Sequence, residues 1–336
     1  MARNSNIEWT EHTFNPWLGC TKISPACDGC YAEAMIDRRF GRVKWGGPRL
    51  RTGEANWEQP RKWNAAAARS GTRHRVFCAS LADVFDNQVP AQWRTDLFEL
   101  ICSTPSLTWM LLTKRPQNIV TMIDQSGILD DHGVRRLPSN AALGATVEDQ
   151  RRAEMNIPAL LRAKSVLAPA FAFILCEPLL GPLDLGHLGL GARDVDIAAD
   201  ADLGLSIDWV VAGGETDQGA HRARPTHPDW LRQLRDQCSA ARVPFHFRQW
   251  GEYREYAGHR IVTSRDLWAT KSAAKAKVSW MAFDGEHIQQ RAGAASNSKL
   301  IAIERLGRRS TGRLIDGAEH NGVPDVFLRS CETQAG

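Results

Sequence analysis

Three cysteines with metal-binding spacing lie near the start of the chain. Cys20, Cys27 and Cys30 fall in the segment GCTKISPACDGCYAEA, residues 19 to 34. The glycine, proline and aspartate residues between and around them predict a loop, and a helix is expected to follow. Because clustered thiolates are characteristic metal ligands, the segment predicts a metal centre with three protein ligands.

Three roles for these thiols are open at this point. A zinc site needs four ligands, and His12 or Cys78 would have to supply the fourth. An iron-sulfur cluster held by three thiolates leaves one iron free, and S-adenosylmethionine can chelate that iron. One electron from the cluster then cleaves the sulfur-carbon bond and leaves a 5'-deoxyadenosyl radical. The third role is that of small apolar side chains.

The spacing of the three cysteines bears on this choice. It is C-x6-C-x2-C, whereas most radical S-adenosylmethionine enzymes have C-x3-C-x2-C. The aromatic Tyr31 directly after the last cysteine matches the arrangement usual in those enzymes.

The elements that must position these residues follow from six short apolar runs, each ending in polar residues. The runs are 75–83, 108–116, 141–149, 171–179, 208–216 and 244–252. Runs of this length predict buried strands of a parallel sheet. Helical spacing of apolar residues occurs between them at 91–103, 149–163 and 227–241, which predicts an α/β fold, either a barrel or a doubly wound layer.

Polar side chains follow the carboxyl ends of these strands. In a parallel barrel that end is the active face, so we expect these residues to converge on one rim. They are Ser80, Asp83, Lys114, Arg115, Thr146, Glu148, Cys176, Glu177, Glu215, Arg248 and Gln249.

Several of these positions have a specific candidate role. Cys176, expected to face the cavity, could return a hydrogen atom to a product radical, and the alternative is a buried apolar thiol. Lys114 and Arg115 could hold a carboxylate or a phosphate. Arg248 and Gln249, with Trp250 after them, suit a base or an adenine.

Composition and charge restrict the class of protein. Hydrophobic residues make up 43% and charged residues 24% of 336 residues, and the net charge is +4, which indicates a globular protein. Arginine and tryptophan alternate over residues 38–63, which suits nucleic acid, although tryptophans packed in the core would explain the same pattern. The N-terminus lacks a signal-peptide pattern and the longest apolar run, 166–176, is too short to span a bilayer, so we expect a cytoplasmic protein without membrane contact.

Several segments together resemble a known family. They are IEWTEHTFNPWLGCTKISPACDGCYAE, RVFCASLADVF, LLTKRP, LGATVED, CEPLLGP, AGGE with HPDW, FRQWGE and GRLIDG. Over residues 5 to about 325 the chain resembles the phage gp thirty-seven/sixty-eight family, which is similar to a divergent branch of the radical S-adenosylmethionine superfamily. The nearest functional analogy is to spore photoproduct lyases.

The resemblance implies a fold and a cofactor. The fold would be a partial or complete parallel (β/α) TIM-like barrel over residues 1–251 that carries the cysteine loop. A C-terminal extension, 252–336, would pack on it, with short antiparallel strands expected at 278–290 and 299–306. Cys20, Cys27 and Cys30 would bind a 4Fe-4S cluster.

The resemblance also implies residue roles. Gly213, Gly214 and Glu215 look like the element that meets the amino group of S-adenosylmethionine. They lie late in the strand order, so Ser80 and Asp83 are rivals, and a tight turn at the two glycines is a further alternative. The remaining candidate cofactor contacts are Tyr31, Thr146, Glu148 and Arg248, and the candidate catalytic residues are Cys176, Glu177 and Lys114.

The expected activity is radical chemistry on nucleic acid, with DNA favoured, either as lesion repair by a lyase or as base modification. The enzyme would be a monomer and would need an electron donor such as flavodoxin or ferredoxin. Two alternatives remain: a zinc-binding, non-catalytic nucleic-acid-binding protein, and a radical enzyme that acts on a small molecule. Cys102, Cys238 and Cys331 are expected to be structural or incidental.

Overall fold

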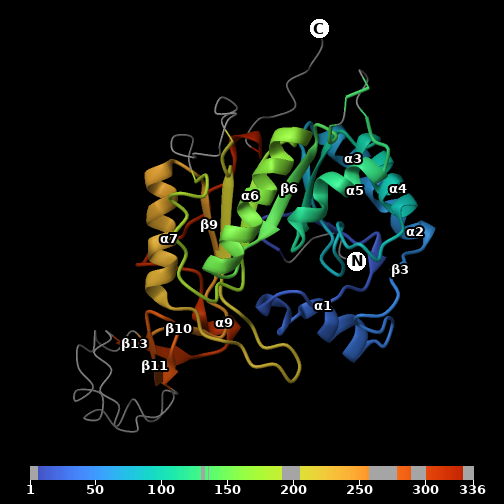
Figure 1. The fold of residues 1–336 in the computed structure, drawn as a ribbon. Helices are drawn as coiled ribbons and strands as arrows, with labels where there is room; N and C mark the ends of the chain where they lie inside the picture. The colour runs from blue at the N-terminus through green and yellow to red at the C-terminus, as the bar shows by residue number, and fades with distance from the viewer. Residues whose placement is uncertain are drawn as a thin grey trace.

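A parallel sheet of seven strands forms the centre of the protein (Figure 1). The computed structural model describes residues 7–129, 133–134, 136–190, 205–256, 278–288 and 300–327. The strands, in spatial order, are β1 (His12–Phe14), β4 (His74–Cys78), β5 (Leu107–Thr113), β6 (Ala141–Thr146), β7 (Ala172–Cys176), β8 (Trp209–Gly213) and β9 (Phe245–Gln249). All six pairings are parallel.

The helices between these strands define the class of fold. They are α3 (Gln59–Ser70), α4 (Ala91–Cys102), α5 (Ile119–Gln125), α6 (Gln150–Leu167) and α7 (Pro228–Ala241). Because every strand of the sheet adds beside the one before it, right-handed crossovers place the connecting helices on a single face. The sheet is therefore a partial (β/α) barrel, and the predicted fold class is confirmed. The six apolar runs became β4 to β9, whereas β1 was not predicted.

The two faces of the sheet carry different side chains. The face under the helices carries many aliphatic residues, among them Val76, Leu111, Leu143, Ile174 and Val210, and also Phe14, Trp109, Phe245 and Phe247. The opposite face, called the inner face below, carries an aromatic cluster of Trp9, Phe77, Phe171, Phe173 and Trp209 together with smaller apolar residues. Strict alternation along each strand separates the two sets, as the pleat of a strand requires.

Gly144 in β6 shows how tightly the inner face is packed. A Cβ atom at this position would lie 2.2 Å from Cζ of Phe173 on the neighbouring strand. Glycine is therefore needed here to let the Phe173 ring lie against the backbone of β6.

A second, antiparallel sheet lies near the C-terminus. It contains β10 (Tyr253–Glu255), β13 (Leu300–Arg305), β11 (Val278–Ala282) and β12 (His287–Ile288), in that order. Met281 and Ile303 of this sheet belong to the same buried cluster as the side chains on the helix-covered face of the parallel sheet. The predicted C-terminal β appendage is confirmed, while the division of the chain at residue 251 stays a prediction. Cys331 and parts of both predicted C-terminal strand segments lie outside the described residues.

The segment between β1 and β4 contains short elements at one end of the sheet (Figure 1). They are β2 (Trp17–Leu18), η1 (Pro25–Cys27), α1 (Tyr31–Glu33), η2 (Ala34–Arg39), β3 (Leu50–Arg51) and α2 (Glu54–Trp57). Trp63 stacks on His12 with ring centroids 4.3 Å apart, and Trp57 meets the ring of Phe14 edge-on. Trp63 is buried, and the Arg51 guanidinium lies over the partly buried Trp57 ring, 4.0 Å from its centroid. Across the described ranges, no helix is long and apolar enough to cross a membrane.

Candidate metal and cofactor site

The cysteine loop is anchored to the carboxyl end of β4. The Gly19 N–H donates to the Leu81 carbonyl at 3.1 Å, and Gly19 forms a parallel bridge with Ala82. Cys20 follows directly, Cys27 ends η1, and Cys30 is the N-cap residue of α1. The loop therefore lies at the carboxyl edge of the parallel sheet, which is the edge that carries active sites in barrels of this kind.

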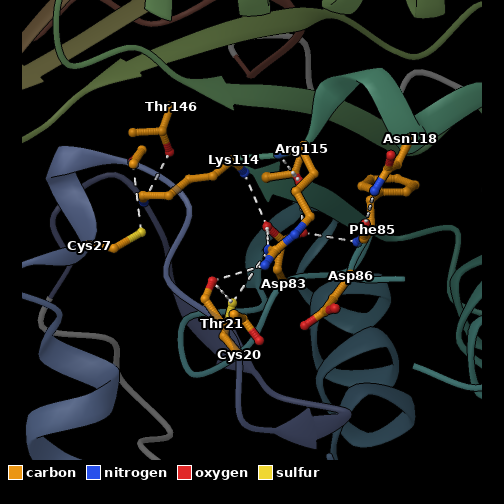
Figure 2. Close-up of polar contacts among 12 residues, drawn as sticks. Cys20, Thr21, Cys27, Asp83, Phe85, Asp86, Lys114, Arg115, Asn118 and Thr146 are labelled. Carbon is orange, nitrogen blue, oxygen red and sulfur yellow. Dashed lines mark hydrogen bonds and ion pairs between the residues drawn. The ribbon is translucent and has the colours of Figure 1, made fainter. Parts of the chain in front are cut away.

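The end of β5 brings two cations to the cysteine thiols (Figure 2). Arg115 Nη1 donates to Cys20 Sγ at 3.4 Å, and its Nη2 donates to the Thr21 carbonyl at 2.9 Å. Lys114 acts electrostatically on Cys30, which also interacts with Cys27. The two residues that follow β5 therefore act on two of the three cysteines, Cys20 and Cys30.

Burial and charge act on the thiols in opposite directions. Burial raises the pKa of Cys20 to about 11, the Asp83 carboxylate adds to the rise, and the Arg115 guanidinium opposes it. Burial also raises the pKa of Cys30, and the charge of Lys114 opposes the rise. Since metals bind the thiolate form, the two cations favour the state that a metal centre requires.

Asp83 fixes the position of Arg115. Its carboxylate accepts from Arg115 Nη1 at 2.9 Å, from Thr113 Oγ1 at 2.6 Å and from the Lys114 N–H at 3.1 Å. Ser80, the other candidate after β4, is hydrogen-bonded through Oγ to Asn15 Nδ2 at 3.1 Å. Both residues thus hold neighbouring strands and loops together.

A layer of polar side chains covers the carboxyl end of the inner face. Lys114 Nζ donates to Thr146 Oγ1 at 3.3 Å. Arg248 Nη1 donates to Glu177 Oε1 at 2.7 Å. A Cβ atom on Gly213 would lie 3.0 Å from the Glu177 carboxyl carbon, so the missing side chain makes room for that carboxylate. Five of the predicted site residues therefore lie on the inner face, above the aromatic cluster. They are Lys114, Thr146, Glu177, Gly213 and Arg248.

Cys176 lies on the other face of the sheet. Its side chain is fully buried in the cluster under the helices, and it interacts with Cys238 of α7. Burial raises the pKa of Cys176 well above its ordinary value. The expectation that this thiol faces the cavity is wrong, because alternation in β7 turns Leu175 inward and Cys176 toward the helices.

Glu148 reaches from the end of β6 to the turn that carries Cys27. Its side chain is 1% exposed, and Oε1 accepts from the Ala26 N–H at 3.3 Å. Among the residues that the structure describes, Oε2 has no hydrogen-bond partner. A buried carboxylate oxygen without a donor is costly, so this atom is placed to accept from a bound group.

Glu215 is held by Arg224. The Glu215 side chain is 4% exposed, and Arg224 donates to it from Nη2 at 2.6 Å and from Nε at 2.9 Å. Although burial raises the pKa of Glu215, the hydrogen bonds and charge of Arg224 hold it below its ordinary value. The same guanidinium donates to the Pro25 carbonyl at 3.0 Å and to Asp28 at 3.2 Å.

This set of contacts, called the Arg224 clamp below, joins the loop after β8 to the turn between Cys27 and Cys30. A Cβ atom on Gly29 would lie 2.6 Å from the His221 ring, so the two loops are in close contact. Sequence reasoning missed Arg224, since nothing in the sequence links it to a turn nearly two hundred residues earlier.

The two remaining candidates, Tyr31 and Gly214, each make one close contact within the chain. Tyr31 is exposed on α1 and its hydroxyl donates to Met35 Sδ at 3.1 Å. A Cβ atom on Gly214 would lie 2.0 Å from the Trp250 carbonyl oxygen. The second glycine after β8 is therefore required by backbone packing against the segment after β9.

Neither side chain that the sequence offers as a fourth zinc ligand is placed to complete such a site. Within the described ranges no three His, Cys, Asp or Glu side chains are arranged to hold one ion. His12 Nε2 is 3.0 Å from His74 Nδ1, and Cys78 is fully buried in β4, so neither supplies a fourth zinc ligand. A cluster takes each thiolate at a different iron, so its ligands need not converge on one point.

The fold and site define a partial parallel barrel with a three-cysteine loop at its carboxyl edge. The chain belongs to the family described as "Protein of unknown function (DUF5131)", whose model matches residues 4–324. A comparison with curated proteins gave no match.

Three solved structures of spore photoproduct lyase are similar to this chain. A point mutant has 10% identity and a TM-score of 0.41. A double mutant with bound AdoMet and dinucleoside spore photoproduct has 10% identity and a TM-score of 0.40. The enzyme complexed with dinucleoside spore photoproduct has 9% identity and a TM-score of 0.38. In each case 81% of this chain and 74% of the other chain are covered.

Proposed function

We propose that this protein is a radical S-adenosylmethionine enzyme in which Cys20, Cys27 and Cys30 hold a 4Fe-4S cluster. The observation that carries the proposal is the position of the three-cysteine loop at the carboxyl edge of a partial parallel barrel, where Arg115 donates to Cys20 Sγ. When bound, the cluster supplies the electron that cleaves S-adenosylmethionine to a 5'-deoxyadenosyl radical.

The chain's own residues bind and orient the reactants in this proposal. Lys114 and Arg115 offset the negative charge of the thiolates. The free Oε2 of Glu148 and the hydroxyl of Thr146 suit the amino and ribose hydroxyl groups of S-adenosylmethionine. Asp83 and Glu215 act as positioning residues, because their oxygens already accept from the protein.

The positions of the other predicted site residues suggest their roles. Tyr31 stays the expected aromatic neighbour of the cluster, and Ser80 is a positioning residue. Glu177 and Arg248 pair on the inner face, where they are placed to contact substrate or cofactor. Cys176 has no part, because it lies under the helices.

The substrate class we propose is nucleic acid, with DNA favoured, and a flavodoxin or ferredoxin would supply the electron. The support for nucleic acid is a cationic cleft beside the cysteine loop. A radical enzyme of this kind would abstract a hydrogen atom from the bound strand for repair or modification.

Anaerobic reconstitution with iron and sulfide tests the cluster. The wild-type protein is expected to bind about four irons and about four sulfides per chain, with broad visible absorption, and to release 5'-deoxyadenosine from S-adenosylmethionine under reduction. Cys20→Ala, Cys27→Ala and Cys30→Ala should each lose the cluster. Cys102→Ala, on the exposed side of α4, is the matched control and should keep it.

Elemental analysis decides between this proposal and zinc. Stoichiometric zinc in the purified protein, with no cluster after anaerobic reconstitution, would refute the radical function. A cluster that assembles equally well in all three cysteine variants would refute the ligand assignment.

A further inference from the structure

A cleft of about 320 Å³ lies beside the cysteine loop. It is bounded by that loop, the loop after β4, the segment after β5 that includes η3 (Pro116–Asn118), and the first turns of α6. Among the described residues that line it are three cations, five side-chain amides and no carboxylate. The cations are Lys114, Arg115 and Arg152.

The positive charge of the cleft is only partly neutralised. Arg115 pairs with Asp83 behind it at 2.9 Å. No described carboxylate forms an ion pair with Lys114, whose Nζ donates to the Thr146 hydroxyl. The Arg152 guanidinium is 3.9 Å from Glu148 Oε1, measured from Nε, and its Nη2 donates to the Ile23 carbonyl. The cleft therefore favours an anion.

The size and rim of the cleft indicate which anion. Its volume corresponds to about ten water molecules, more than a phosphate group alone would fill. Ile23 and Met155, which are 38% and 45% exposed, line it beside the cations and amides. Cations suit a phosphate, amides suit base edges, and exposed apolar side chains suit the face of a base.

We propose that this cleft binds a nucleotide unit of a single nucleic-acid strand. The phosphate lies toward Arg152 and Lys114, and the base lies against Ile23 and Met155. Because Thr21 and Ile23 belong to the cysteine loop, a strand held here passes directly beside the thiols. The inference deepens the proposed function, which supplies the reaction, but binding to the cleft needs no cluster.

Binding of a fluorescent single-stranded DNA oligonucleotide, followed by anisotropy over a range of salt concentrations, tests the site. Arg152→Gln is expected to weaken binding about tenfold and to reduce the salt slope by about 1. Arg151→Gln is the matched control. It makes the same charge change at the preceding residue of α6, which is exposed and outside the cleft, and this variant should bind the strand nearly as the wild type does.

Arg152 also holds the cysteine loop through the Ile23 carbonyl. A second pair of variants therefore separates the loss of charge from a loosening of that loop. Gln88 lines the cleft and its side chain is exposed. Gln88→Glu should weaken strand binding by repulsion, and Gln88→Lys should strengthen it. Equal effects of the two arginine variants, together with no opposite effects at Gln88, would overturn the proposal.

Competition distinguishes the possible occupants. AMP and inorganic phosphate, at concentrations equal to that of the nucleotide units of the strand, should not displace it. Displacement by AMP would assign a free-nucleotide site, and displacement by S-adenosylmethionine would assign the cleft to the cofactor; either result overturns the strand proposal.

Iron and sulfide are measured on the same preparations. Strand binding without a cluster would remove the radical function and leave this inference in place. A cluster without strand binding would remove this inference and leave the radical function in place.

Discussion

Lys114 and Arg115 are neighbours in the chain and serve opposite sides of the strand end. Lys114 points along the inner face to Thr146, whereas Arg115 reaches Cys20 and Asp83 (Figure 2). One dipeptide thus links the cysteine loop, the polar layer of the inner face and the cationic cleft. The alternation of side chains at the end of a strand is what allows two adjacent cations to do this.

The buried His246 contributes to the pH dependence of stability. Burial, together with the charges of Arg313, Arg248 and Arg75, lowers the pKa of His246 from 6.5 to about 4, against the opposing charge of Glu177. The unfolded chain therefore binds a proton more readily than the folded protein. The stabilisation from the neutral ring is complete above pH 6.5 and falls as pH drops toward 4.

We expect protonation of His246 to lower the unfolding free energy by up to about 3 kcal/mol between pH 6.5 and pH 4. Urea unfolding of wild type and His246→Leu at pH 7 and pH 4.5 measures it, and the variant should show the smaller pH difference. His187→Leu, at an exposed position, is the control. Identical pH dependence in wild type and His246→Leu would contradict the assignment.

At the scale of elements, the loop after β8 holds the cysteine loop through the Arg224 clamp. Glu215 is nearly inaccessible and accepts only from partners that the fold brings to it. Removing Arg224 leaves a buried carboxylate without its counter-charge, which costs about 3 kcal/mol or more. It also frees the turn between Cys27 and Cys30.

Arg224→Ala is therefore expected to lower the unfolding free energy and, after reconstitution, to lose iron to a chelator faster than the wild type. Arg222→Ala is the matched control, since Arg222 is 73% exposed and pairs only with Asp217 among the described residues. Adding Glu215→Gln to Arg224→Ala should recover part of the stability. Unchanged iron loss in Arg224→Ala would show that the clamp does not position the loop.

At the scale of the whole molecule, the two sheets share one core. Met281 and Ile303 of the antiparallel sheet pack in the buried cluster that includes Trp230 and Leu234 of α7. Trp230 Nε1 also donates to the Phe283 carbonyl at 2.7 Å. These contacts should couple the unfolding of both sheets.

Met281→Ala is expected to lower the unfolding free energy of the whole chain by about 2–5 kcal/mol. Tryptophan fluorescence and far-UV circular dichroism should report one shared transition in urea. Leu314→Ala, at a half-exposed position, is the control and should change little. Two separate transitions would show that the antiparallel sheet unfolds independently of the barrel.

The sequence by itself predicted β4 to β9 and the helices α4, α6 and α7, because apolar runs and helical spacing are local patterns, whereas α3 and α5 were not predicted. β1 was missed because three residues carry too little pattern. The sequence also pointed to the cysteine loop and to the residues at strand ends.

Only the tertiary structure decided which of those residues share a face. The side to which Cys176 points depends on the register and pleat of β7, and a shift of one residue reverses it. The pairing of Arg224 with Glu215 and with the turn at Asp28 depends on loop packing across the barrel edge. Contacts between distant parts of the chain leave no periodic signal in the sequence, and these contacts place the thiols beside Lys114 and Arg115.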